Sequence, residues 1–187
     1  VWTFDWRGQG LSTRLLPNRQ KGYVGTFDEY LSDWDGWMNE VVQPSLTQKP
    51  QLLAHSMGGH LALRYLAEHP GRFERAVVIA PLVQFPVATA RSLMVWILRF
   101  LRWVGIGRWY FVRGDYDEAG PSFGGNRLTS DPERFQMMAD CVRANPKLAL
   151  GGVTIHWLVK AADSIEALYR SAHQITDPVL LIAPEDE

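Results

Sequence analysis

The sequence predicts an α/β fold built on a mostly parallel sheet with crossover helices. Short apolar runs, typical of buried strands, alternate with longer stretches in which apolar residues recur at helical spacing. Residues 50–54, 76–80 and 179–183 are predicted strands, and residues 58–69 and 155–171 are predicted helices. This order favours parallel pairing, because a crossover helix returns the chain to the end of the sheet at which the previous strand began.

Residues 1–81 form the first part of the predicted core. Residues 1–5 read as a short buried strand, and two closely spaced glycines in the loop after it mark a turn that needs unusual backbone angles. Thr26 is expected to cap a helix that runs to about Val42. Glu29 stands three residues after Thr26, as a capping box requires.

The character of the sequence changes after residue 81. Residues 82–152 contain no clear buried strand but an apolar helix at about 90–104 and a polar helix at 131–144. We expect residues 82–152 to be a helical cap inserted into the core, and residues 153–187 to be the second part of that core. The chain opens inside one apolar run and ends directly after another, so we expect the domain to be incomplete at both ends.

The composition excludes several classes of protein. A hydrophobic fraction of 47% and a formal net charge of −1 describe a globular chain without the basic face of a nucleic-acid partner. Cys141 is the single cysteine, and we expect it to be a half-buried helix residue rather than a nucleophile. No charge-free apolar run reaches the roughly 20 residues that span a bilayer. Because no residues have convincing ligand spacing, we predict no metal and no cofactor.

The sharpest motif, A-H-S-M-G-G, lies at residues 54–59 between a predicted strand and a predicted helix. That context is what a nucleophile elbow requires, so Ser56 is the predicted nucleophile. The backbone N–H of Met57 is the predicted oxyanion donor, helped by the helix dipole. The tight turn is expected to need small residues two positions either side of the serine, where Ala54 and Gly58 stand.

This motif has two other interpretations. Ser56 could simply cap the following helix, but the strand before it favours the elbow. His55 and His60 are tempting general bases, yet a residue beside the nucleophile points elsewhere and His60 lies one helical turn further on. We therefore expect His55 to pack beneath the elbow.

Two motifs together resemble those of the α/β-hydrolases. Residues 4–12 resemble the D-x-R-G-x-G-x-S loop of that fold, and residues 54–59 resemble its G-H-S-M-G-G elbow. Residues 23–37, 128–135 and 149–157 make the chain similar to the bacterial lysophospholipase L2 and monoacylglycerol lipase family. The family often reads G-G-P-T in the last stretch, where this sequence reads G-G-V-T. The resemblance covers essentially the whole chain.

This resemblance implies an α/β-hydrolase with a cap, which cleaves a carboxylic ester of a lysophospholipid or monoacylglycerol through an acyl-enzyme. It places the acid of the triad at Glu187, or at Asp186 if the loop is one residue shorter, with Glu185 third. The catalytic histidine and the second oxyanion donor would lie outside the sequence, which is then nearly inactive alone. His156 and His173 precede the acid, so neither is the expected base.

The apolar helix of the predicted cap suits an acyl chain or the surface of a lipid aggregate. Trp96 and Phe100 within it, and Trp157 further along, are candidate substrate contacts; the alternative for the helix is packing on the core, and Trp157 fits the core better. The arginines of this helix could meet lipid phosphate or remain in solvent. We therefore expect a peripheral membrane contact through the cap. The expected location is the cytoplasm or the inner face of a bacterial membrane.

Two rival functions stay open at this point. One is a short-chain carboxylesterase of the same fold. Epoxide and haloalkane hydrolases of this fold carry Asp at the elbow, so Ser56 argues against those two classes. The other is a non-catalytic binding protein of the α/β-hydrolase fold, against which the intact elbow argues.

Overall fold

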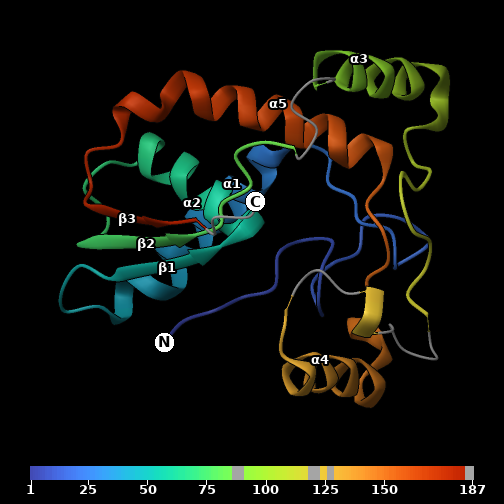
Figure 1. Ribbon diagram of the computed structural model, residues 1–187. Coiled ribbons are helices and arrows are strands. Elements are labelled where there is room, and N and C mark those ends of the chain that lie inside the picture. Colours follow the sequence, from blue (N-terminus) through green and yellow to red (C-terminus); the bar gives the residue numbers. More distant parts are fainter. Residues whose placement is uncertain (86–90, 118–122, 126–128, 184–187) are drawn as a thin grey trace. The chain divides into compact units, whose positions relative to one another are not determined.

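The computed structural model describes residues 1–85, 91–117, 123–125 and 129–183 (Figure 1). The chain divides into two compact units. The sheet unit consists of Gly25–Arg99 and Val159–Glu187, and the loop unit consists of Val1–Val24 and Phe100–Leu158.

The sheet unit contains three parallel strands in the order β1-β2-β3. They are β1 (Gln51–His55), β2 (Arg75–Ile79) and β3 (Val179–Ile182). At one end of the sheet, Ile79 of β2 is level with His55 of β1 and with Ile182 of β3. The predicted parallel sheet is therefore confirmed, and each of these strands lies within one residue of its predicted bounds.

Helices cover this sheet (Figure 1), and most of the side chains that they bury are apolar. They are α1 (Phe27–Trp37) with its π-helical and 3₁₀ continuations η1 (Met38–Val42) and η2 (Gln43–Ser45), α2 (Ser56–Glu68), and α5 (Ile155–Ser171) with the 3₁₀ turn η6 (Ala172–Gln174). The buried side chains of α2 include Leu61, Tyr65 and Leu66. Trp34 of α1 stacks on Tyr65 with ring centroids 4.4 Å apart, which joins these two helices.

The start of α1 differs in one respect from the predicted capping box. Thr26 is the N-cap residue, but its side chain makes no capping hydrogen bond. The backbone N–H of Glu29 donates instead to the carbonyl oxygen of Thr26 at 3.3 Å. The Glu29 carboxylate lies against Gly25, one residue before the cap, because glycine leaves the space that a Cβ would fill.

The loop unit shows one predicted strand to be wrong. Residues 1–5 form no strand, because an apolar run becomes a strand only when a neighbour completes its hydrogen-bond ladder. Asp5 organises the following loop instead: its Oδ2 accepts from Leu11 N at 2.9 Å, and its carbonyl accepts from Ser12 Oγ at 2.6 Å. Gly8 (φ 78°) and Gly10 (φ 51°) have the unusual backbone angles that the sequence predicts.

Short helices make up much of the loop unit. The chain enters it at the end of α3 (Arg91–Leu101), and then forms η3 (Arg102–Ile106), η4 (Phe123–Gly125), α4 (Pro132–Ala144) and η5 (Pro146–Leu148). Asp131 caps α4 by accepting from the backbone N–H groups of Glu133 and Arg134, at 2.9 and 3.2 Å. Cys141 on α4 is exposed rather than half-buried, because the helix turns Phe135 and Ala139 inward instead.

The G-G-V-T stretch is a backbone crossing. Gly152 N donates to Gly114 O at 2.9 Å, and Gly152 O accepts from Gly22 N at 3.0 Å. A Cβ at Gly152 would overlap the carbonyl oxygen of Val112. Thr154 then donates from its Oγ1 to Gly22 O at 3.0 Å just before α5 begins. Glycine at position 152 is thus required by the close approach of three backbone segments.

We predict that Gly152→Ala lowers the free energy of unfolding by about 1–3 kcal/mol, because the new methyl group must displace backbone. Urea unfolding of the complete protein measures this loss. Gly114→Ala is the matched control, because a Cβ there would meet no atom of the described residues within 4 Å and should change stability by less than about 0.5 kcal/mol. Equal losses in the two variants would contradict the crossing as the cause.

Candidate active site at the strand-to-helix turn

Ser56 stands in a sharp turn between β1 and α2. The strand ends at His55 and the helix begins at Ser56, with no residue between them. The backbone of Ser56 has φ 54°, in the left-handed region that is costly for a residue with a Cβ. Ser56 is exposed in the described structure. The turn therefore presents the serine at the carboxyl end of β1, as the motif predicts.

Packing against the end of β2 holds this turn. Ser56 O accepts from Leu82 N at 3.0 Å, which ties the elbow to the segment that follows β2. A Cβ at Gly59 would lie 3.0 Å from Val78 Cγ1 and 3.1 Å from Pro81 Cβ. The first turn of α2 thus lies almost directly on the carboxyl end of β2.

Gly59, rather than the expected Gly58, is the position that requires glycine. A Cβ at Gly58 would have no described atom within 4 Å, outside the backbone of its own helix, whereas Gly59 is crowded. The reason is the direction of α2, which turns Gly59 rather than Gly58 toward the sheet. Ala80, at the end of β2, has φ 41° and is a second non-glycine residue in the left-handed region. Both of the strained non-glycine residues described in the sheet unit thus lie at the carboxyl ends of its strands.

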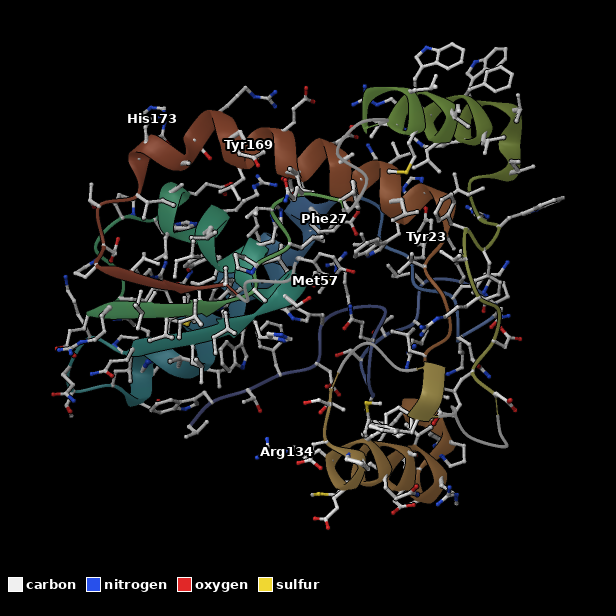
Figure 2. The ribbon with its side chains drawn as sticks, in the orientation of Figure 1. Tyr23, Phe27, Met57, Arg134, Tyr169 and His173 are labelled. Carbon is white, nitrogen blue, oxygen red and sulfur yellow. The ribbon has the colours of Figure 1, made fainter. Side chains whose placement is uncertain are left out.

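Met57 is half-buried in the first turn of α2 (Figure 2). The helix dipole is positive there, and backbone N–H groups of a first turn point away from the helix body. An anionic oxygen close to Ser56 would meet this positive end of α2.

The candidate acids Asp186 and Glu187 lie outside the described residues, as does Glu185. The strand before them is described: Ile182 O accepts from Ala80 N at 2.7 Å, so β3 ends at the edge of the sheet where Ser56 stands. Two strand spacings, about 10 Å, separate the ends of β1 and β3.

His60 is fully buried and is bound by a polar network rather than directed at Ser56. Its Nε2 lies 2.7 Å from Ser164 Oγ on α5. Arg64 Nη1 donates to the same oxygen at 3.1 Å and to Asp28 Oδ1 at 2.8 Å. Arg64 can only donate, so Ser164 Oγ accepts from it, while the donor in the His60–Ser164 bond depends on the tautomer of the imidazole. The network joins α1, α2 and α5.

Burial, and to a smaller extent the nearby charge of Arg64, lower the pKa of His60 to about 4. His60 is therefore neutral at ordinary pH. The sequence holds one signal of this network, the placement of His60 and Arg64 four residues apart on one face of α2, but the partner Ser164 is far along the chain.

The other histidines considered as bases are His55, His156 and His173, and each has a different environment. His55 is exposed rather than packed beneath the elbow, since residues at odd positions of β1 point outward. His156 stacks on Tyr23 in the loop unit, with ring centroids 4.8 Å apart. His173 is exposed in η6, ahead of the amino end of β3.

The candidate substrate contacts are divided between the two units. Trp96 is 65% exposed and lines a cavity of about 460 Å³ between α3 and α5, together with Phe85, Ile165 and Tyr169. Phe100 in the loop unit is 47% exposed and lies 5.9 Å from the ring of Trp103. Trp157 is only 9% exposed and packs in the core.

Two further properties concern the described residues as a whole. None of their helices is long and apolar enough to cross a membrane. They contain no group of three or more His, Cys, Asp or Glu side chains placed to hold a metal ion.

Solved structures define the fold. A monoacylglycerol lipase of Paleococcus ferrophilus matches 96% of this chain with a TM-score of 0.63 and 21% identity, over 60% of its own chain. A soluble variant of monoglyceride lipase from Saccharomyces cerevisiae matches 96% with a TM-score of 0.58 and 20% identity, over 56% of its chain. The fold is that of the α/β-hydrolases.

The family can be stated more closely. The serine aminopeptidase S33 family matches residues 1–187, and this chain belongs to it. Lysophospholipase L2 of Escherichia coli strain K12 is 31% identical over the whole chain, which spans 55% of that protein. A probable lysophospholipase L2 of Haemophilus influenzae is 32% identical over the whole chain, which spans 58% of it. The chain thus spans little more than half the length of these relatives.

The lowered pKa of buried His60 predicts how the free energy of unfolding depends on pH. An unfolded histidine binds its proton below about 6.5, whereas folded His60 stays neutral down to about 4. The unfolded state therefore binds more protons in this range, and acidification from pH 6.5 to pH 4 should cost about 2–4 kcal/mol through this residue. Urea unfolding of the wild type and His60→Gln at several pH values measures the difference.

The His60→Gln variant should show a flatter dependence on pH, because glutamine can accept from Ser164 without titrating. His173→Gln is the control, since it removes an exposed histidine and should leave the pH dependence as it is. The same slope in wild type and His60→Gln would contradict the buried neutral state.

Proposed function

We propose that this chain carries the nucleophile of a serine hydrolase that cleaves the carboxylic ester of a lysophospholipid or monoacylglycerol. The observation that carries the proposal is Ser56 in a strained and exposed turn at the positive end of α2. The named activities of the relatives, lysophospholipase and monoglyceride lipase, support the class of substrate. Both substrates have a single acyl ester on a glycerol backbone.

The proposed reaction is an acyl-enzyme cycle. Ser56 Oγ attacks the ester carbonyl while a histidine, expected outside the printed sequence, takes its proton. The N–H of Met57 donates to the tetrahedral oxyanion, and the carboxylate of Glu187 or Asp186 orients the histidine. The alcohol leaves with the proton from the histidine. Water then attacks the acyl-serine by the same steps, which releases the fatty acid and restores the serine.

The division into core and cap is part of the proposal. Residues 1–81 and 153–187 would belong to the hydrolase core, and residues 82–152 to a cap that bears substrate contacts. The apolar walls of the cavity between α3 and α5 support Trp96 as such a contact. Tyr169 Oη donates to Val83 O at 3.2 Å on the wall of this cavity, one residue from the Leu82 that binds the elbow. Phe100 and Trp157 remain proposed contacts.

Exposed apolar residues at helical spacing over residues 93–104, the apolar stripe, support a peripheral membrane contact. Its members recur every three or four residues and are all at least 43% exposed: Leu93, Trp96, Ile97, Phe100, Trp103 and Val104. Arg99 and Arg102 flank them, although Arg99 also pairs with Asp163 at 2.9 Å. A helix with an aromatic face and flanking arginines suits the interface of an anionic bilayer.

Reaction of the complete protein with a fluorophosphonate probe tests the nucleophile. The wild type should be labelled and Ser56→Ala should not, because the probe forms a covalent bond with an activated serine. Hydrolysis should fall in the same variant by about 10³-fold or more. A second variant, Ser45→Ala, removes a serine away from the elbow and should be labelled like the wild type.

Labelling of Ser56→Ala would overturn this assignment, and no labelling of the wild type would favour a non-catalytic binding protein. The substrate class is tested separately with lysophosphatidylcholine, monoacylglycerol and p-nitrophenyl acetate. Cleavage of the acetate alone would favour a short-chain carboxylesterase.

We predict that Trp103→Ser weakens binding to vesicles that contain phosphatidylglycerol by about five- to tenfold, because a side chain that is 80% exposed would lose its insertion into the interface. Co-sedimentation with vesicles measures the binding of the complete protein. Trp109→Ser removes a tryptophan that is 63% exposed but lies outside the stripe, and should bind like the wild type. Equal binding of all three proteins would contradict the membrane contact.

A further inference from the structure

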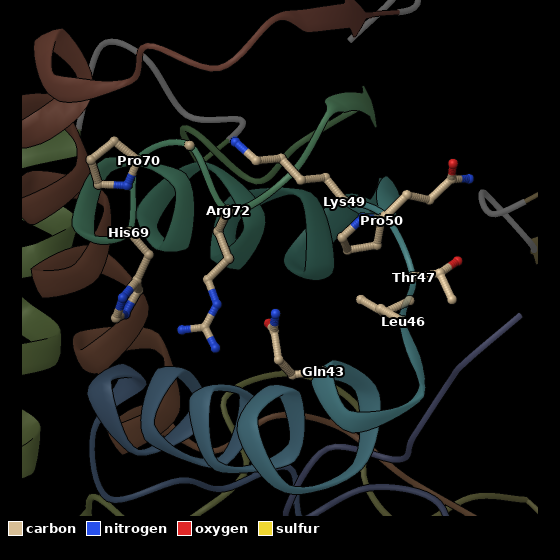
Figure 3. Close-up of a pocket in the computed structure, with 10 residues that line it drawn as sticks. Gln43, Leu46, Thr47, Lys49, Pro50, His69, Pro70 and Arg72 are labelled. Carbon is tan, nitrogen blue, oxygen red and sulfur yellow. The ribbon is translucent and has the colours of Figure 1, made fainter.

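A second hollow lies at the amino end of β1, whereas Ser56 follows the carboxyl end of that strand. Figure 3 shows the residues that line this hollow. Its volume is about 520 Å³, within the range of small-molecule sites. One wall is the segment ahead of β1, which carries Lys49, and the other is the segment after α2, which carries His69 and Arg72. The length of β1, about 16 Å at 3.3 Å per residue, separates this hollow from the elbow. It is therefore distinct from the candidate active site.

Buried and paired carboxylates hold the wall after α2 in place. Pro70 ends the helix, and Gly71 follows with φ 77°. Gly71 N donates to Asp177 Oδ2 at 2.8 Å, and Asp177 is only 8% exposed. Arg72 Nη1 donates to Asp35 Oδ1 at 2.8 Å and its Nη2 donates to Asn39 Oδ1, so the guanidinium has a fixed position and keeps its remaining N–H groups for a ligand. Figure 3 shows Arg72 in the middle of the hollow.

The charge of the hollow is positive. None of its 10 lining residues is Asp or Glu. The Asp35 partner of Arg72 compensates that charge in part, and it also accepts from Tyr65 Oη at 2.8 Å. Lys49 makes no ion pair with any residue in the described part of the chain. Its Nζ lies 3.9 Å from the position of a Cβ on Gly71, so the ammonium reaches across to the opposite wall.

We propose that this hollow binds a small molecule that bears a phosphate group. The ammonium of Lys49 and the fixed guanidinium of Arg72 supply separate cationic donors, which suit the several charged oxygens of one phosphate better than a carboxylate. Gln43 and His69 add polar groups on either side of Arg72 (Figure 3). Leu46 forms an apolar part of the wall and leaves room for an organic group. A ligand bound at the amino end of β1 cannot reach Ser56. It therefore acts as a regulator rather than as a substrate.

Calorimetric titration of the complete protein with inorganic phosphate and with glycerol phosphate tests the site. The titrations use the Ser56→Ala variant, so that binding is independent of the proposed ester hydrolysis and of its failure. We expect a dissociation constant of about 1 mM or below for glycerol phosphate, which rises with ionic strength. Lys49→Glu should weaken binding about tenfold or more, because it replaces an attractive charge with a repulsive one.

Lys147→Glu is the matched control, since it makes the same charge change on an exposed lysine of the loop unit and should bind phosphate like its parent. Tighter binding of glycerol phosphate than of inorganic phosphate would support a role for the apolar wall as well. The proposal is overturned if neither compound binds at about 10 mM, or if Lys49→Glu and Lys147→Glu bind equally.

Discussion

The contact between the first turn of α2 and the carboxyl end of β2 is the constraint on which the elbow depends. Gly59 allows this contact, since a Cβ there would lie 3.0 Å from Val78 and 3.1 Å from Pro81. The close approach leaves no room for a loop between β1 and α2, so the chain must turn within one residue. Ser56 takes the strained backbone that this turn imposes.

The surrounding polar groups stabilise the same arrangement. The hydrogen bond from Leu82 N to Ser56 O fixes the elbow from one side, and the His60–Ser164 hydrogen bond fixes α2 to α5 from the other. Because these groups are buried, each unsatisfied partner would cost about 1–3 kcal/mol, so the network favours one position of α2. A neutral His60 suits this role, since a charged imidazole beside Arg64 would repel it.

The two ends of the parallel strands have different properties. Strained backbone and the positive end of α2 meet at the carboxyl ends, where ligands bind in open α/β sheets. At the amino ends, Asp177 and Asp35 hold Gly71 and Arg72 in place around a hollow that is positively charged. The length of the strands thus separates the proposed catalytic chemistry from the proposed phosphate site.

The sequence by itself determined the parallel sheet, most helix bounds and the serine turn, because hydrophobic periodicity and the A-H-S-M-G-G motif are local signals. It did not determine that residues 1–5 lack strand pairing, that Gly59 rather than Gly58 is crowded, or that His60 bonds to Ser164. Each of these depends on which distant segment lies opposite. Strand ladders, close backbone approaches and buried polar pairs join residues far apart in the chain, so only the tertiary structure decided them.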